Sequence, residues 1–248
     1  MSQLFDKEKT VMSNLNAVVV DLETTGLAPK TDKIIEIGAV RIRNGKAEDT
    51  FSRLVYPGRV LSTQTSEITG ITDDMLKRQP VFAQILDELL AFLGEDVLLG
   101  HNIQFDFSFL KKAVLNELPK KSKFEKMGID TLRIARRFLP GEQKKTLSAL
   151  CDYYDIPLSA HRAANDALAT FALYEKLYEE FADGDPEAFR ERQLIYQVKK
   201  ESPVMEKQIR QIRELLQRTQ VSCPYDIEKM TKNEASRYID SLRTGLAK

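Results

Sequence analysis

Short apolar strands come before and between helical patterns in this chain, and this order constrains its fold more than any other feature. The β-branched runs at residues 17–22 and 34–42 indicate two strands, and Asn44-Gly45 is a typical hairpin turn into a third near residues 50–55. Helical spacing then alternates with further short strands: we expect helices at 81–93, 105–118, 131–138, 147–154 and 163–181, and strands at 96–100 and around Ile129. Strands joined both by a hairpin and through helices make a mixed sheet. The sequence therefore predicts an α/β fold with a mixed β-sheet flanked by helices.

A second feature divides the chain in two. The segment 182–186 (Ala-Asp-Gly-Asp-Pro) breaks the helical pattern and predicts a boundary between residues 1–183 and a small C-terminal α-helical appendage, residues 184–248. Two apolar stripes indicate the helices of this appendage: Met205, Ile209, Ile212 and Leu216, then Ala235, Tyr238, Ile239 and Leu242. The second stripe follows a capping box, Thr231 with Glu234. The stripes must bury against each other or against the first domain; in the alternative, the first tail helix simply extends the main core.

The charges of the chain balance, with 37 Lys and Arg against 37 Asp and Glu, so a site for a polyanion would have to be local. Between residues 111 and 145, eleven Lys or Arg stand against four Asp or Glu. A solvated helix face is one interpretation of this excess. The other is a basic rim that steers phosphates. Its candidate residues are Lys120, Lys121, Lys123, Arg136, Arg137, Lys144 and Lys145.

Two cysteines without a Cys-x-x-Cys pair argue against a disulfide framework or a zinc knuckle. The N-terminal residues lack the apolar stretch of a signal peptide, and no apolar run approaches the roughly 18 residues that a membrane span needs. We therefore expect a cytoplasmic protein with no membrane partner.

Acidic side chains mark the end of the first strand. Asp21 and Glu23 are two residues apart, so both carboxylates project from the same face of the sheet. Like charges beside an apolar core repel each other unless a cation lies between them. An isolated Asp-x-Glu pair also occurs where a strand simply ends in solvent. Other segments of the sequence are therefore needed to show whether the pair belongs to a cation site.

Two later segments also carry acids where a helix begins. In residues 100–106 (Gly-His-Asn-Ile-Gln-Phe-Asp) a buried strand ends, and Asp106 lies near the first turn of the next helix, with Asn102 as its candidate cap. In residues 160–166, His161 precedes the long helix, and Asp166 lies one turn inside it beside the apolar stripe. A buried carboxylate there needs a partner. The chain has only two histidines, and both fall in these segments.

Taken in order, DLETTG, GHNIQFD and HRAANDA resemble the three motifs of the DEDDh 3′-to-5′ exonucleases, the superfamily that includes the proofreading subunits and domains of replicative polymerases. ITGIT at residues 68–72 and DTL at 130–132 are weaker landmarks of the same family. The resemblance covers roughly residues 17–181 and implies an RNase H-like sheet.

By this resemblance, the four acids hold two divalent cations, Mg²⁺ or Mn²⁺, and His161 is the general base. Asp21 bridges the two ions. Glu23 and Asp166 hold the ion beside the attacking water, and Asp106 holds the other, largely through water.

The resemblance also maps the binding of the terminal nucleotide to Thr25, Gly26 and Leu27, with Asn102 and Phe105 from the second motif. For Leu27 and Phe105, packing in the hydrophobic core is the alternative interpretation.

The implied activity is the release of nucleoside monophosphates from single-stranded 3′ ends of DNA, in proofreading or repair. An exoribonuclease that trims RNA 3′ ends is the alternative within the class, because nothing in the motifs reads the 2′-hydroxyl. A nuclease fold used as a binding module is the alternative from another class, and the complete set of acids argues against it. A polymerase or another protein partner would bind through the C-terminal helices.

Overall fold

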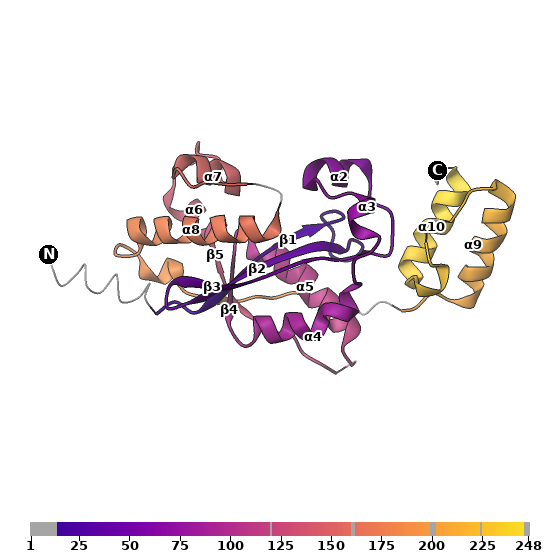
Figure 1. Ribbon diagram of the computed structural model, residues 1–248, viewed down its shortest axis with the longest axis horizontal. Coiled ribbons are helices and arrows are strands. Elements are labelled where there is room, and N and C mark those ends of the chain that lie inside the picture. Colours follow the sequence, from indigo (N-terminus) through magenta and orange to yellow (C-terminus); the bar gives the residue numbers. More distant parts are fainter. Residues whose placement is uncertain (1–13, 120, 160–161, 199–201, 224, 246–248) are drawn as a thin grey trace.

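The computed structural model describes residues 14–119, 121–159, 162–198, 202–223 and 225–245. Its strands are β1 (Ala17–Thr24), β2 (Ile34–Arg43), β3 (Lys46–Leu54), β4 (Val97–Gly100), β5 (Met127–Asp130) and β6 (Arg192–Gln193). They form one sheet in the order β3-β2-β1-β4-β5-β6 (Figure 1). Because β1 pairs antiparallel with β2 and parallel with β4, the predicted mixed sheet is confirmed.

Helices cover both faces of this sheet. They are α2 (Thr63–Thr69), α3 (Asp73–Leu76), α4 (Phe82–Leu93), α5 (Ile103–Glu117), α6 (Thr131–Phe138), α7 (Leu147–Tyr153), α8 (Ala163–Phe181), α9 (Glu206–Thr219) and α10 (Lys232–Thr244), with short 3-10 turns η1 (Pro186–Phe189) and η2 (Ile227–Lys229). In Figure 1, α6, α7 and α8 lie on one face of the sheet, and α4 and α5 lie on the other.

The central strand β1 is buried on both faces. Val18, Val20 and Leu22 belong to the core shared with α4 and α5. Ala17 and Val19 belong to the core shared with α6, α7 and α8. A strand covered on both sides has a continuous apolar sequence rather than an alternating one, which is the run seen at the start of the chain. The odd-numbered positions of β1 therefore face α8.

Most predicted elements are present, and the hairpin shows why. Asn44 and Gly45 have φ angles of 51° and 69°, the left-handed conformation that both positions of a tight hairpin turn require. The predicted helices at 131–138 and 163–181 coincide with α6 and α8, and the ends of the other helices predicted in the first domain differ by at most two residues.

Helices α2 and α3 were not expected, because neither is long enough to display an apolar stripe. The signals for α2 are instead the residues that cap its two ends. The Ser62 side chain accepts a hydrogen bond from the Thr65 N–H at the start of α2, and Gly70 ends that helix at φ 67°. This glycine is the centre of the ITGIT landmark, and it lets the buried Ile71 turn back into a small core with Ile35 and Leu76.

The boundary expected after Asp183 does not coincide with the end of the first packed unit. Beyond it, Phe189 of η1 still lies in the core under α8. Strand β6 pairs with β5, and Leu194 lies in the core on the opposite face. A local break such as 182–186 ends a helix, but it does not show where the following residues pack.

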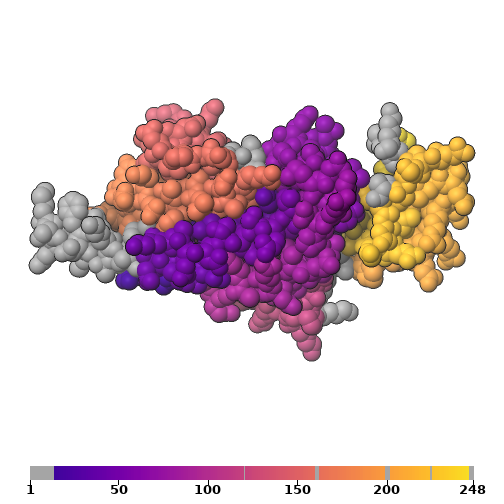
Figure 2. Space-filling view, viewed as in Figure 1, coloured from indigo at the N-terminus to yellow at the C-terminus, as the bar shows by residue number. Residues whose placement is uncertain are grey.

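The helices α9 and α10 form a unit of their own (Figure 2, yellow). Their buried side chains make one cluster that contains only residues of the tail: Ile212, Met230, Ala235, Tyr238, Ile239 and Leu242. The predicted capping box starts α10, where the Thr231 side chain accepts from the Glu234 N–H at 3.2 Å and the Glu234 carboxylate accepts from the Thr231 N–H at 2.8 Å. Met205, expected in the first stripe, is instead exposed and lies just before α9.

Candidate active site

The pairing of β1 with β2 brings the start of α8 against the acids of the first motif. Gly38 of β2 lies opposite Asp21 of β1. A Cβ atom at Gly38 would be 2.0 Å from the carbonyl carbon of Ala163, so only a glycine lets the first turn of α8 lie on the strand at this point. Asp166 is in that turn and therefore reaches the odd-numbered face of β1.

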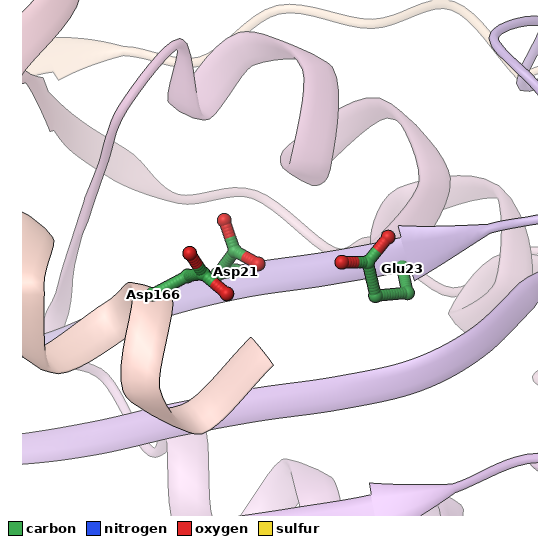
Figure 3. Close-up of side chains that lie close together, drawn as sticks. All are labelled: Asp21, Glu23 and Asp166. Carbon is green, nitrogen blue, oxygen red and sulfur yellow. The ribbon is translucent and has the colours of Figure 1, made fainter. Parts of the chain in front are cut away.

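Three carboxylates converge as a result (Figure 3). Asp21 and Glu23 project from β1, Asp166 projects from α8, and one ligand oxygen of each lies within 4.8 Å of those of the other two. Asp166 is held by its own helix, because its Oδ2 accepts a hydrogen bond of 3.0 Å from the Arg162 N–H. Oxygen donors at this spacing suit a hard divalent cation such as Mg²⁺ or Mn²⁺.

Asp106 reaches the same strand end from the other motif. It lies in the first turn of α5, is 5% exposed, and accepts a 3.1 Å hydrogen bond from the N–H of Leu22. It is not part of the cluster of three, but its charge acts on Asp21. The structure thus brings all four acids of the motifs to one end of β1.

The closeness and burial of these acids raise the pKa values of their carboxyl groups. Burial, followed by the charges of Asp106 and Asp166, raises the pKa of Asp21 well above its usual value. Burial and then the charge of Asp166 raise the pKa of Glu23 to about 7. Burial also raises the pKa of Asp106. Carboxylates with raised pKa values repel one another when ionised, and a bound cation removes this repulsion.

One buried acid of the site was not expected. Glu36 of β2 lies opposite Glu23, is 4% exposed, and accepts a long hydrogen bond of 3.4 Å from the N–H of Ala163. Its carboxylate is also 3.7 Å from the guanidinium of Arg162. Glu36 therefore binds the first residues of α8, next in sequence to His161. The available signal was a single acid inside the otherwise apolar run Ile34–Ile37.

The expected general base cannot be placed, because His161 lies outside the described residues. The other histidine, His101, is engaged on both ring nitrogens. Its Nδ1 lies 2.9 Å from the Thr131 hydroxyl, and its Nε2 lies 2.8 Å from the Lys145 carbonyl. Burial lowers the pKa of His101. His101 thus joins the end of β4 to the start of α6 and to the loop before α7.

The loop after β1 carries three of the residues expected to contact the terminal nucleotide. Asp32 organises this loop: its Oδ2 accepts from the Ala28 N–H at 2.9 Å, and a Cβ atom at Gly26 would be 2.6 Å from the same oxygen. The Thr25 hydroxyl accepts from the Lys33 N–H at 3.1 Å. Leu27 is 84% exposed, so it does not pack in the core.

The second motif supplies the other two expected contacts. Asn102 adopts a left-handed backbone, φ 68°, at the start of α5, but its side chain does not cap the helix as expected. Its backbone N–H instead donates to Asp130, the Asp of the DTL landmark, whose carboxylate also caps α6. Phe105 packs against the core, with its ring centroid 5.0 Å from that of Phe109.

The side chains of the predicted basic rim differ in whether they are exposed or held by other residues. Lys121, Lys123, Arg136 and Lys144 are exposed, and Lys120 lies outside the described residues. Arg137 is paired with Asp185, and the ammonium of Lys145 donates to the carbonyl oxygens of Pro140 and Gln143. Arg137 and Lys145 therefore stabilise the local structure. Among the helices of the described ranges, none is both long and apolar enough to cross a membrane.

Comparison with known proteins identifies a family for this chain. The chain matches the family model RNase_T, described as Exonuclease, over residues 18–174. It is 41% identical over 177 residues to the PolC-type DNA polymerase III of Halalkalibacterium halodurans, a match that covers 68% of this chain and 12% of that protein. It is 35% identical over 164 residues to DNA polymerase III subunit epsilon of Aquifex aeolicus, covering 66% of this chain and 80% of that subunit. The chain thus spans only about 12% of the length of its PolC-type relatives.

Solved structures show the same architecture. A structure of exonuclease X in complex with 5′ overhanging duplex DNA superposes with a TM-score of 0.53 at 28% identity, covering 67% of this chain and 93% of that one. The nuclease domain of 3′hExo, described as a DEDDh family member bound to rAMP, has a TM-score of 0.56 at 21% identity, covers 73% of this chain and 97% of that one, and supports the fold alone. The family model covers more than half of the chain, so the protein belongs to the RNase_T exonuclease family, and the resemblance to exonucleases that the motifs predicted is confirmed at that level.

Proposed function

We propose that this chain is a metal-dependent 3′-to-5′ exonuclease that releases nucleoside monophosphates from DNA ends. The observation that carries the proposal is the convergence of Asp21, Glu23 and Asp166 within 4.8 Å, inside the segment that matches the exonuclease family. Phosphodiester hydrolysis needs an activated water and a neutralised leaving oxygen. Two Mg²⁺ or Mn²⁺ ions about 3.5–4 Å apart would supply both.

Residues of the chain would bind the ions and accept the proton of the attacking water. Asp21 would serve both ions, because its carboxylate belongs to the cluster of three and its pKa is also raised by the charge of Asp106. Glu23 and Asp166 would hold the ion on the α8 side. His161, which directly precedes Arg162 at the start of α8, would take the proton of the attacking water.

The exposed Leu27 and the loop of Thr25 and Gly26 would hold the terminal nucleotide, with Asn102 from the second motif. Phe105 would support this surface from the core rather than contact a base, because it packs on Phe109. The exposed members of the basic rim would attract the phosphate backbone.

DNA is the favoured substrate because the relatives at 35% and 41% identity are named as DNA polymerase III proteins. The same names support a polymerase as protein partner, and we assign that contact to the outer faces of α9 and α10. Because these relatives are bacterial and bacterial DNA lies in the cytoplasm, we also propose the cytoplasm as the location of the activity.

The test compares single-stranded DNA, duplex DNA and RNA of matched sequence, labelled at the 5′ end, in Mg²⁺ and in EDTA. We expect stepwise shortening from the 3′ end, mononucleotide products, faster loss of DNA than of RNA, and no reaction in EDTA. Full activity in EDTA, or cleavage of a closed circular strand, would contradict the proposal. Faster loss of RNA would favour the exoribonuclease alternative.

A further inference from the structure

Two hollows lie between the first packed unit, called here the catalytic unit, and the C-terminal helices. In Figure 2 these helices are the yellow lobe beside the body of the molecule. The hollows have volumes of about 310 and about 470 Å³, within the size range of ligand sites. Both hollows are lined by Lys33, Tyr56, Val81 and Lys229, so they adjoin, and together they are called here the interdomain cleft. None of the four motif acids lines it.

The larger hollow is cationic. Lys33, Arg59, Lys229 and Arg237 line it, against the two carboxylates of Asp226 and Glu234. Lys33 is held by Glu234 at 3.2 Å across the two units. Lys229 pairs with Asp226 at 3.0 Å, but these side chains are 85% and 53% exposed, so the pair is weak and easily exchanged for another anion.

Aromatic rings stand on both walls of the cleft. Tyr56 belongs to the catalytic unit and Tyr225 to the tail, and both are only partly buried. Tyr225 is fixed by an edge-to-face contact with Tyr238, with ring centroids 4.9 Å apart. Cations combined with partly exposed aromatic rings are the composition of grooves that bind single-stranded nucleic acid, where phosphates meet the cations and bases stack on the rings.

The cleft begins beside the candidate active site. The guanidinium of Arg59, which lines the cleft, donates to the Thr25 hydroxyl and lies 3.2 Å from the Asp32 carboxylate. Thr25 directly follows β1, whose last residues carry Glu23. A nucleic-acid strand with its 3′ end at the loop of Thr25 would therefore be separated from the cleft only by Arg59, whose side chain contacts both.

We propose that the interdomain cleft binds the single-stranded nucleic acid that lies behind the 3′-terminal nucleotide, with its phosphates on Lys229 and Arg237 and its bases against Tyr56 and Tyr225. This proposal rests on the proposed function, since it assigns the path of the same substrate. An acidic peptide would satisfy the cations but would leave the two tyrosine rings without a flat partner, so nucleic acid is the better match.

The test uses the full chain with the double substitution Lys229→Glu and Arg237→Glu. Its hydrolysis kinetics are measured on DNA strands of about 3 and about 20 nucleotides, which bracket the usual site sizes of single-strand binding folds. Because both side chains are exposed, the variant should fold as the wild type does, which circular dichroism checks. We expect KM on the long strand to rise roughly tenfold with kcat unchanged, and KM on the short strand to stay the same. The slope of log affinity against log salt should fall by about 1.4, the value for two lost phosphate contacts at roughly 0.7 each.

The matched control is Lys207→Glu with Lys232→Glu, which makes the same charge change at exposed lysines of the tail that do not line the cleft. Equal effects of the two double variants would overturn the cleft as a specific site. Tyr225→Ala should weaken long-strand binding about 5- to 150-fold, the range for loss of one stacked base.

A binding measurement separates this proposal from the proposed function. Fluorescence anisotropy with a labelled 20-nucleotide strand in EDTA needs no hydrolysis. Weaker binding by the cleft variant supports the cleft even if the wild type cuts nothing, in which case the exonuclease proposal alone fails. Binding equal to that of the wild type, or tighter wild-type binding of a Glu-rich peptide than of the strand, would overturn the cleft proposal.

Discussion

The carboxylates at the end of β1 are arranged at the expense of stability. Asp21, Asp106 and Glu23 all have raised pKa values, because the fold buries them and sets them near one another. An apolar core does not need such acids, and a cation explains them. Folding and function therefore conflict at this end of the strand.

Asp21→Asn should abolish Mg²⁺-dependent hydrolysis while raising the melting temperature of the metal-free protein. The amide keeps the shape of the side chain and removes the charge that the neighbouring acids oppose. A gain of about 1 kcal/mol would raise Tm by about 2–4 °C in a chain of this size. The measurement is thermal unfolding in EDTA beside an activity assay, with exposed Asp49→Asn as control. A lower Tm in EDTA would show that the charge stabilises the fold.

The stabilising effect of Mg²⁺ should grow with pH. The pKa of Glu23 rises from 4.5 to about 7 in the folded protein, chiefly through burial. Between these values the unfolded chain releases a proton that the folded protein keeps, so the stability of the metal-free protein falls as the pH rises. A cation that binds the carboxylate restores it. We expect the Tm increase caused by saturating Mg²⁺ to be several degrees larger at about pH 8 than at about pH 5; an increase independent of pH would exclude Glu23 as a ligand.

His161→Ala should reduce kcat by about 10²–10⁴-fold, the range for loss of a general base, with little change in metal affinity. The metal ligands remain in this variant, so isothermal titration with Mn²⁺ should give a binding constant close to that of the wild type. A variant with near wild-type kcat would assign the base to another group and weaken the DEDDh assignment.

At the scale of elements, the site depends on how closely α8 approaches the sheet. Gly38 allows this approach, and Glu36 binds the N–H of Ala163 at the start of the helix. Neither residue carries out chemistry. Both lie on β2, the strand next to the one with the first two acids, so the hairpin of β2 and β3 serves as a support for the helix that carries Asp166.

Gly38→Ala should therefore cost at least about 3 kcal/mol of stability, the upper end for overpacking, because the clashing atoms belong to the backbone of α8. Any protein that folds should have lost most of its Mn²⁺ affinity, since Asp166 moves with the helix. Gly141→Ala is the matched control, because a Cβ atom there meets nothing within 4 Å. Denaturant unfolding and metal titration measure both effects, and a Gly38→Ala protein with normal metal affinity would contradict this role.

At the scale of the whole molecule, the described residues form one packed unit whose core includes side chains as far along the chain as Tyr196, and a helical pair with its own core. We therefore propose that the boundary lies between Tyr196 and the start of α9. The family match ends at residue 174, before the tail begins.

A chain that ends at Val198 should be folded and should hydrolyse a trinucleotide at a normal rate. A chain that ends at Asp183 should be less stable by about 3–6 kcal/mol, because it lacks the buried Phe189 and Leu194, each worth about 1.5–3 kcal/mol. Thermal unfolding of the two truncated chains measures the difference. Equal stability would return the boundary to Asp183, and an insoluble chain ending at Val198 would make the tail part of the catalytic core.

The sequence by itself determined the longer helices and strands of the first domain and the acids of the motifs. Helices such as α8 and turns such as Asn44-Gly45 are set by periodicity and by backbone preference over a few residues, which are local properties. The spacing of Asp21 and Glu23 is local as well, because side chains two residues apart on a strand share one face of the sheet.

Only the tertiary structure decided the features that depend on contacts between distant residues. The hydrogen bond from Ala163 to Glu36 joins residues 127 positions apart. The packing of Leu194 against Gly128, and the cleft between Tyr56 and Tyr225, likewise join distant parts of the chain. No local pattern encodes such pairs, because the same helix or strand keeps its periodicity whatever it packs against. The acids could therefore be named from the sequence, but the residues that support them, the packing of residues 186–196 against the first unit and the interdomain cleft could not.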